Sequence, residues 1–390
     1  MGTHSQDPGG TLKVAVIHSF YSSGQPSGEN SVVRDQVAAL ERAGHNVILW
    51  ERETDREAQR WDYPVRTLIR VASGRGVSPR DALSDFRPDV VHVHNLFPNI
   101  SNGWLLEHRW PTVVSLHNYR AVCSNGTLFR DGGICTDCVT GGSFHAVVHG
   151  CYRGSPLATA PVALSRRRDR RILHQAADAI ITTSQGSDRI LRTFLGADLR
   201  THVIPNFTPD VSPAQNPSAS NSRWLAMGRF SPEKGFAELI QSWPEGPALD
   251  VIGDGPLRSQ LMDMARARRV SIKPVLPLDE LREVLSAYVG LVFPSTWFDV
   301  APQVVSEAMR VGLPVVALAT NTVADVVNAT GSGATYLTDA ELARAIRQVE
   351  SNRPDMSRAA RACYESNWTE RAWLSAVDSL YADVAQLPLG

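Results

Sequence analysis

Short buried strands alternate with helical segments along almost the whole chain, and this alternation limits the possible folds more than any other feature. The pattern runs through a first half, stops at a segment rich in proline, serine and asparagine, and then starts again. Strands that alternate with helices build parallel sheets with helices on both faces. The sequence therefore predicts an α/β protein with two doubly wound, Rossmann-like domains.

The expected domain boundaries follow from the same pattern. We place an N-terminal domain at 11–208, with a cysteine-rich insert at 120–155, a linker at 209–222 and a C-terminal domain at 223–366. The remaining residues, 367–390, are expected to form a helical tail. The expected strands are 12–17, 46–50, 90–93, 112–116, 179–182 and 202–204 in the first domain, and 224–227, 249–252, 270–272, 290–293 and 314–317 in the second. Expected helices include 29–43, 257–268, 278–287 and one that begins near Pro161.

Composition narrows the class of protein. The 390 residues carry a formal net charge of −1, which gives no argument for nucleic acid or bulk membrane attraction. No apolar run approaches the length of a membrane span, and no signal peptide pattern is visible. We therefore expect a cytoplasmic protein. Lysine occurs only at Lys13, Lys234 and Lys273, so Lys234 is a conspicuous cation.

The stretch 291–318 combines a buried strand, a loop, a short helix and a second buried strand. Pro302 favours the helix start and Gly312 its end. Asp299 precedes the helix and Glu307 lies within it, and the N–H groups of the loop and the helix dipole make an anion site at a strand end. Two acids beside an anion site suit a ligand with hydroxyls and phosphates, such as a nucleotide sugar. Alternatively, Asp299 caps the helix and Glu307 is a solvated residue.

A glycine-rich turn with two cations follows the first strand of the second domain, in the sequence Gly228-Arg229-Phe230-Ser231-Pro232-Glu233-Lys234-Gly235. When a sugar–phosphate bond breaks, negative charge builds up on the leaving diphosphate. Arg229 can contact two phosphate oxygens at once, and Lys234 acts as a point charge. The alternative is a solvated turn with no ligand.

The first domain offers weaker candidates. Gly28 belongs to a turn after the first strand, where glycine lets the backbone approach a phosphate or an acceptor. His117 follows the buried strand 112–116, at the end where ligands of parallel sheets bind. His94 follows another strand and is a further candidate for the same region, whereas we expect His92 to be architectural.

Four cysteines gather in the insert: Cys123, Cys135, Cys138 and Cys151. The spacing Cys135-x-x-Cys138 is typical of chelation, and a closed set of four thiolates would hold a structural zinc. His145 and His149 are possible substitutes for one thiolate. Reduced free cysteines or a labile disulfide are the alternatives. Cys363 is expected to be an isolated helix residue.

These motifs together resemble the retaining glycosyltransferases of family 4, which have the GT-B fold. Glu307-Ala308-Met309, Gly312 and the stretch 314–317 match the family's second acidic motif, and 228–235 matches its G-R-x-x-x-x-K-G turn. Asp299 departs from the glutamate that the family usually has there. The resemblance covers about residues 12–370.

The resemblance implies two domains facing across a cleft, with the ligand between the carboxyl ends of their strands and the tail crossing back to the first domain. It implies that Glu307 binds the ribose, and that Asp299, Val300 and Ala301 hold the sugar and its phosphate. His117 would reach the reaction centre, Gly28 and Gly228 would approach the donor, and the backbone near Val275 and Leu276 would meet the nucleobase. No divalent metal is needed for the chemistry.

The expected activity is transfer of a sugar from a nucleotide-diphosphate sugar to an acceptor hydroxyl, in surface polysaccharide, glycolipid or secondary-metabolite biosynthesis. A nucleotide-sugar hydrolase or epimerase of the same fold, or a sugar-binding scaffold without activity, are the alternatives. The arginine-rich run 166–171 could meet an anionic lipid or a lipid-diphosphate acceptor as a peripheral membrane contact, or be a solvated helix face. No nucleic-acid partner is expected.

Overall fold

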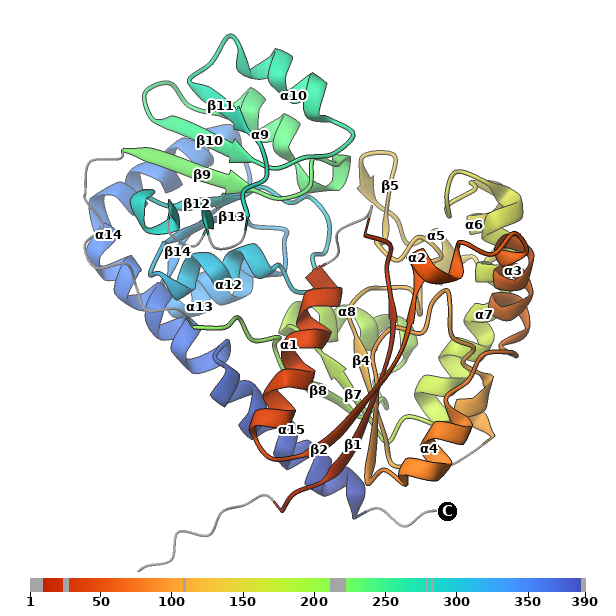
Figure 1. The fold of residues 1–390 in the computed structure, drawn as a ribbon. Helices are drawn as coiled ribbons and strands as arrows, with labels where there is room; N and C mark the ends of the chain where they lie inside the picture. Colours follow the sequence, from red (N-terminus) through yellow and green to blue (C-terminus); the bar gives the residue numbers. More distant parts are fainter. Residues whose placement is uncertain are drawn as a thin grey trace, which may run out of the picture. The chain divides into compact units, whose positions relative to one another are not determined.

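The structure is a computed structural model that describes residues 10–23, 28–107, 110–210, 222–277, 280–281 and 284–386. The chain divides into two compact units (Figure 1). Unit 1 comprises residues 1–128, 135–206 and 373–390, and unit 2 comprises residues 129–134 and 207–372. Each unit contains one six-stranded sheet in which every strand pair is parallel. The predicted class of two Rossmann-like α/β domains is confirmed.

The sheet of unit 1 has the strand order β2-β1-β3-β4-β7-β8. Its strands are β1 (Lys13–Phe20), β2 (Asn46–Glu53), β3 (Val90–Val93), β4 (Thr112–Leu116), β7 (Ala179–Thr182) and β8 (Thr201–Val203). The order changes direction between β1 and β3. In open parallel sheets, ligands bind at the carboxyl ends of the strands at such a switch point.

Helices surround this sheet (Figure 1). They are α1 (Gly28–Arg42), α2 (Thr54–Glu57), α3 (Tyr63–Ser73), α4 (Arg80–Phe86), the 3-10 helix η1 (Gly103–Leu106), α5 (Asp137–Thr140), α6 (Phe144–Val148), α7 (Pro156–Gln175), α8 (Gln185–Leu195) and most of α15 (Glu370–Ala385). The expectation that a helix begins near Pro161 is wrong, because α7 starts at Pro156 and Pro161 lies inside it. Ser155 caps the helix by accepting a hydrogen bond from the Ala158 N–H, and proline suits the first helical position.

The sheet of unit 2 has the order β11-β10-β9-β12-β13-β14, the strand order of the dinucleotide-binding Rossmann fold. Its strands are β9 (Arg223–Met227), β10 (Ala248–Ile252), β11 (Val270–Lys273), β12 (Leu291–Phe293), β13 (Val315–Leu318) and β14 (Gly333–Tyr336). The sequence pattern did not predict β14. The switch point of this sheet lies between β9 and β12.

Two separate hydrophobic cores explain why the strands of unit 2 read as continuous apolar runs. In β9, Trp224 and Ala226 enter the core on one face, while Leu225 and Met227 enter the core on the other. A parallel sheet that is covered on both faces buries successive side chains in alternate directions. A strand of this kind is therefore apolar at most positions, and Asp250 in β10 is a buried exception.

The helices that cover the sheet of unit 2 are η2 (Pro232–Lys234), α9 (Phe236–Ser242), α10 (Arg258–Ala265), η3 (Leu285–Ala287), α12 (Gln303–Arg310), α13 (Val323–Thr330) and α14 (Asp339–Asn367). A small hairpin, β5 (Phe129–Arg130) and β6 (Gly133–Ile134), is also assigned to this unit. The expected helix 278–287 falls partly outside the described residues, as does most of the expected linker. Among the helices that the structure describes, none combines the length and the apolar character that crossing a membrane would require.

Candidate functional site

Two loops meet at the switch point of unit 2, and glycine makes their close approach possible. The first loop, 228–235, follows β9, and the second, 294–302, follows β12. Gly235 has a φ of +67°, and a Cβ at this position would lie 2.2 Å from the carbonyl oxygen of Pro294. Only glycine fits both the backbone angle and the contact. The end of the first loop is therefore packed directly on the start of the second.

An ion pair joins the two loops at this point. Lys234 Nζ lies 2.5 Å from Oδ2 of Asp299, which is 6% exposed. The same oxygen accepts hydrogen bonds from the Ser295 hydroxyl at 3.2 Å and from the Trp297 indole N–H at 3.1 Å. The ammonium group also lies 5.2 Å from the centre of the Trp297 ring. Three donors therefore engage one oxygen of this buried carboxylate. The carboxylate in turn fixes the position of the Lys234 ammonium group.

Glu233 connects Arg229 to the same pair of loops. Its Oε1 accepts hydrogen bonds from the Ser231 hydroxyl at 2.7 Å and from Arg229 at 3.1 Å, while its backbone carbonyl accepts from the Thr296 N–H at 3.0 Å. Burial acts to raise the pKa of Glu233, but the hydrogen bonds from Ser231 and Arg229 outweigh it and lower the pKa below its ordinary value. Arg229 is 64% exposed, so its guanidinium group is tethered at one side and open to a ligand.

The start of α13 fixes the second loop from the other side. The Asn321 amide donates to the carbonyl oxygens of Ser295 and Trp297, and the Thr322 hydroxyl donates to that of Asp299. Both side chains are polar groups that the sequence analysis missed. In the sequence, only their position just after β13 indicated a role, because that strand ends at the same edge of the sheet. The loop that carries Asp299 is thus held by side chains and not only by its own backbone.

The other predicted residues of unit 2 lie around these loops. Val300 is buried, Ala301 is half-buried, and Glu307 lies on the half-buried side of α12 while Val305 and Ala308 on the same helix enter the core. Gly228 follows β9 with a φ of +151°. The segment after β11 places Val275 in an exposed position and Leu276 in a half-buried one. The structure joins Lys234 and Asp299 directly and leaves the roles of the remaining residues as predictions.

Four histidines pack together at the carboxyl ends of the strands of unit 1: His18, His92, His94 and His117. A ring nitrogen of His94 lies 2.9 Å from one of His117, and these two rings are stacked. Burial lowers the pKa of His117 to about 4, and it lowers the pKa of His18 and of His92 to about 3. The predicted site residue His117 is therefore a neutral imidazole at pH 7, and its partner His94 belongs to the same cluster.

His92 is architectural in position, because it ties the C-terminal helix to the sheet. Its Nδ1 lies 2.6 Å from the Tyr381 hydroxyl on α15, and its Nε2 lies 2.7 Å from the Ser115 hydroxyl on β4. Both contacts are buried. Part of the predicted helical tail, 367–390, therefore packs within unit 1.

A cavity of about 150 Å³ opens beside the histidines, with His94, His117 and Glu29 in its lining. Glu29 is the second residue of α1 and directly follows the predicted Gly28. Burial raises the pKa of Glu29 to about 8, although the positive charge of Arg120 opposes this rise. A carboxyl group with a perturbed pKa in a cavity is a candidate for function. In the sequence, the only indication of a role for Glu29 was its place next to Gly28 in the turn after the first strand.

In the described insert, the four cysteine thiols do not converge on one point as ligands of a single ion would. All five cysteines lie in described segments, and none of them forms a disulfide. Burial raises the pKa of Cys138, and the neighbouring Cys123 and Cys151 add to this rise. Among the described residues, however, the cysteines do not form a group of three with their ligand atoms within 4.8 Å of one another. The four-thiolate zinc site stays a prediction, and Cys363 is a buried residue of α14.

The arginine-rich run 166–171 lies in the middle of α7, and Arg166 and Arg168 are half-buried. Arg168 donates to Asn102 and to the carbonyl oxygens of Val71 and Ala72. Arg166 donates to the Cys138 carbonyl and the Ser143 hydroxyl. Arg167, Arg170 and Arg171 are the exposed cations of the run.

Comparisons with known proteins fit this architecture. Residues 26–210 match the family model described as Glycosyltransferase Family 4, and residues 212–366 match the one described as Glycosyl transferases group 1. None of the curated proteins compared with the chain matches it.

Solved glycosyltransferase structures are similar in fold. Sucrose-phosphate synthase from Thermosynechococcus elongatus is 16% identical, with a TM-score of 0.66 over 96% of this chain and 99% of that one. Anabaena HepE in complex with UDP-glucose is 16% identical, with a TM-score of 0.61 over 95% of this chain and 100% of that one. WaaG, a glycosyltransferase involved in lipopolysaccharide biosynthesis, is 14% identical, with a TM-score of 0.59 over 96% of this chain and 100% of that one.

The two family matches follow each other along the chain and coincide with two parallel-sheet units. The structural neighbours share this GT-B fold over nearly their whole length. The chain is a GT-B glycosyltransferase in which a family 4 domain is followed by a group 1 domain.

Proposed function

We propose that the chain is a retaining glycosyltransferase that moves a sugar from a nucleotide-diphosphate sugar to an acceptor hydroxyl, in the synthesis of a surface polysaccharide, a glycolipid or a secondary metabolite. The observation that carries this proposal is the Lys234–Asp299 ion pair between the two switch-point loops of unit 2. The structures of Anabaena HepE with UDP-glucose, with UDP and glucose, and with UDP support a nucleotide sugar as the donor.

In this proposal the diphosphate of the donor binds over the loop 228–235. Arg229 and Lys234 stabilise the negative charge that develops on the leaving group, so the transfer needs no divalent metal. Glu307 binds the ribose hydroxyls, and the N–H groups of Val300 and Ala301 contact the sugar phosphate. The nucleobase docks against the backbone near Val275 and Leu276.

The contacts of Asp299 support a more specific role than the one its sequence position implies. Its carboxylate is nearly fully buried and is engaged by Lys234, Ser295 and Trp297. We therefore propose that Asp299 positions the ammonium group of Lys234 for the leaving diphosphate, in addition to holding the sugar. A shorter acid than the family's usual glutamate suits this contact, because the loops already approach closely at Gly235.

Retention is proposed to proceed with the leaving phosphate as the acceptor of the proton from the attacking hydroxyl, on the face from which it departs. A separate side-chain base is then unnecessary. The neutral state of His117 is compatible with a hydrogen bond to a sugar hydroxyl. Gly28 lets the backbone at the start of α1 approach the ligand.

The activity is tested by incubating the protein with nucleotide sugars, with and without an acceptor, and by assigning the anomeric configuration of the product by NMR. Acceptor-dependent release of nucleoside diphosphate with retained configuration is expected. Rapid release without an acceptor would identify a hydrolase, a changed sugar would identify an epimerase, and binding without turnover would identify a scaffold. An inverted product would contradict the proposed mechanism.

A peripheral membrane contact has its own support in unit 1. Eight large apolar side chains are exposed on or beside three helices, and α3 and α6 both pack against α7. They are Trp61, Val65, Leu68, Ile69, Phe144, Val148, Leu157 and Leu164. Trp61 is 95% exposed and Leu157 is 82% exposed. On α7, Leu157 and Leu164 are two turns apart and so share one face.

Exposed arginines accompany these apolar residues, among them Arg60, Arg66, Arg167 and Arg171. Apolar side chains next to cations are typical of helices that lie in the interface of an anionic bilayer. We propose that this face of unit 1 docks on an anionic membrane surface at the cytoplasmic side. Large exposed apolar patches mark interaction sites.

Cosedimentation with vesicles tests the docking surface. The wild type should bind vesicles that contain phosphatidylglycerol better than neutral ones, and binding should fall when Trp61, Leu68 and Leu157 are all replaced by serine. Leu337→Ser is a matched control, because Leu337 is 59% exposed but belongs to unit 2. Equal binding by the triple variant and the wild type, or no binding by the wild type, would refute this surface.

A further inference from the structure

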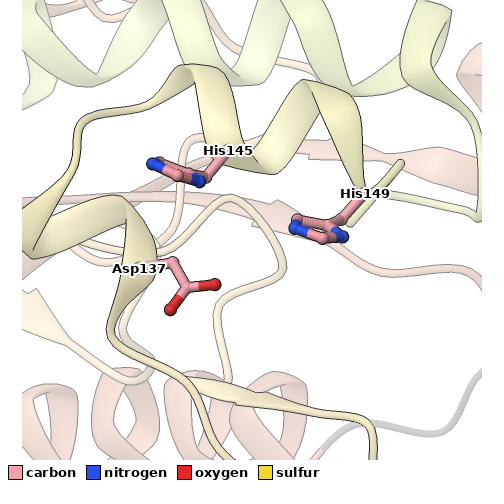
Figure 2. A group of neighbouring side chains, drawn as sticks. All are labelled: Asp137, His145 and His149. Carbon is pink, nitrogen blue, oxygen red and sulfur yellow. The ribbon is translucent and has the colours of Figure 1, made fainter.

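Three side chains in the insert of unit 1 come together as a possible metal site. Asp137 is the first residue of α5, His145 lies in α6, and His149 caps the end of α6. One ligand atom of each lies within 4.8 Å of the other two. Figure 2 shows both imidazole rings on the side of α6 that faces Asp137. A carboxylate oxygen and two ring nitrogens thus converge from two helices.

The local sequence accounts for this convergence. His145 and His149 are four residues apart, so they lie on one face of the helix. Gly141 ends α5, and Gly142 has a φ of +92°, which turns the chain so that α6 packs against α5. A Cβ on Gly141 would lie 2.5 Å from Nε2 of His145. The imidazole therefore occupies space that only a glycine at position 141 leaves open.

We propose that Asp137, His145 and His149 bind one zinc ion that fastens α5 to α6. Imidazole nitrogens and a carboxylate oxygen are ordinary zinc ligands, and two histidines four residues apart on a helix have the spacing of known zinc sites. Three protein ligands leave one position of a tetrahedral ion for water or another ligand. We assign this site no part in the transfer chemistry, and its expected effect is on the order and stability of the insert.

This site has a different ligand set from the four thiolates that the sequence suggests. The sequence pattern Cys135-x-x-Cys138 predicts sulfur ligands, whereas the structure brings together oxygen and nitrogen ligands. The sequence pattern indicates His145 and His149 only as substitutes for a thiolate and does not indicate Asp137. The two ligand sets therefore predict different absorption spectra of the bound metal and different effects of the cysteine and histidine substitutions.

Cobalt(II) titration of the full chain, followed by visible and near-ultraviolet absorption, tests the proposal. Wild-type protein should bind cobalt at this site with d–d bands and without a sulfur-to-metal charge-transfer band, and Cys135→Ser/Cys138→Ser should retain this binding. His145→Ala and His149→Ala should each weaken it by more than roughly tenfold, the loss that removal of even an outer partner can cause. His202→Ala, an exposed histidine on β8, is the control.

Two further measurements keep the test decisive if a variant loses stability. Gly141→Ala removes no ligand but displaces the His145 ring, so it should also weaken binding. Zinc should raise the melting temperature of the wild type and of His202→Ala but not of His145→Ala, and all three should melt alike without metal. The proposal fails if the histidine variants bind cobalt like the wild type, if the wild type binds none, or if the cysteine variant binds none.

Discussion

At the scale of single residues, the proposed function rests on two cations, Lys234 and Arg229, that the switch-point loops hold in different ways. Lys234 is half-buried and paired with the buried Asp299, while Arg229 is mostly exposed and is tethered by Glu233. A preorganised charge contributes more to catalysis than a mobile one, because it needs no reorganisation as the reaction proceeds. We therefore propose that both cations are preorganised for the leaving diphosphate, Lys234 by Asp299 and Arg229 by Glu233.

Arg229→Ala and Lys234→Ala should each lower turnover by roughly 10²–10³, the scale for loss of one preorganised charge-stabilising group. Initial rates with saturating donor measure this, and circular dichroism checks that each variant is folded. Arg266→Ala is the matched control, since this arginine is exposed and pairs with the exposed Asp263. Turnover near the wild-type value in both folded variants would remove these residues from the proposed machinery.

The two acids should separate in binding experiments. Glu307→Ala should weaken the free nucleoside diphosphate, since hydrogen bonds to charged groups contribute roughly 1.5–3 kcal/mol. Asp299→Asn should leave that affinity closer to the wild type, and should lower turnover because Lys234 loses its charged partner. Calorimetry with the nucleotide and with the nucleotide sugar distinguishes the two effects. Equal loss of affinity for the free nucleotide in both variants would show that the roles are assigned wrongly.

At the scale of secondary-structure elements, the ends of strands and helices bring buried titratable groups together in unit 1. Glu29 at the start of α1 has a pKa raised to about 8, whereas His117 after β4 has a pKa lowered to about 4. Burial disfavours the charged form in both cases. These groups should give stability a dependence on pH that single substitutions can reveal.

Glu29→Gln should become more stable relative to the wild type as the pH rises from about 4.5 to about 8. The unfolded chain releases the Glu29 proton near pH 4.5, but the folded chain keeps it until about pH 8. The wild type therefore loses stability across this window, and the glutamine variant does not. The difference should exceed about 1 kcal/mol, because one unit of pKa shift corresponds to about 1.4 kcal/mol. Urea unfolding at several pH values measures it, and a constant difference would contradict a raised pKa.

Tyr381→Phe should destabilise unit 1 by about 1–3 kcal/mol, because it leaves a buried nitrogen of His92 without its partner on α15. Thermal unfolding of the variant measures the loss. Tyr288→Phe is a useful comparison, because its hydroxyl also bonds a buried group, Asp250, but in unit 2. An unchanged melting temperature for Tyr381→Phe would mean that α15 contributes little through this contact.

At the scale of the whole molecule, the repeated strand–helix alternation was sufficient to predict two parallel sheets. Most expected strands lie within a few residues of the observed ones, because buried parallel strands read as apolar runs. The sequence did not predict β14, since Gly333 and Thr335 interrupt its apolar run. It misplaced the start of α7 because Pro161 looks like a helix boundary, although Pro156 already serves as one.

The site was predictable only in part, for reasons of long-range contact. The motifs of Lys234 and Asp299 were visible, but the pair joins residues 65 positions apart. The same holds for His94 and His117, whose rings stack across two strands, and for Asn321, which bonds a loop more than 20 residues away. Sequence spacing reports local geometry, whereas these contacts depend on strand order.

The central claim is that the switch-point loops of unit 2 bind a nucleotide-diphosphate sugar. The direct measurement is a thermal-shift screen of nucleotide sugars and free nucleoside diphosphates against the wild type and Lys234→Ala. A ligand at 100 times its dissociation constant should add about 2.7 kcal/mol to wild-type stability, and clearly less to the variant at the same concentration. If no nucleotide stabilises the folded wild type, or if the best one stabilises Lys234→Ala equally, the assignment of this site is wrong.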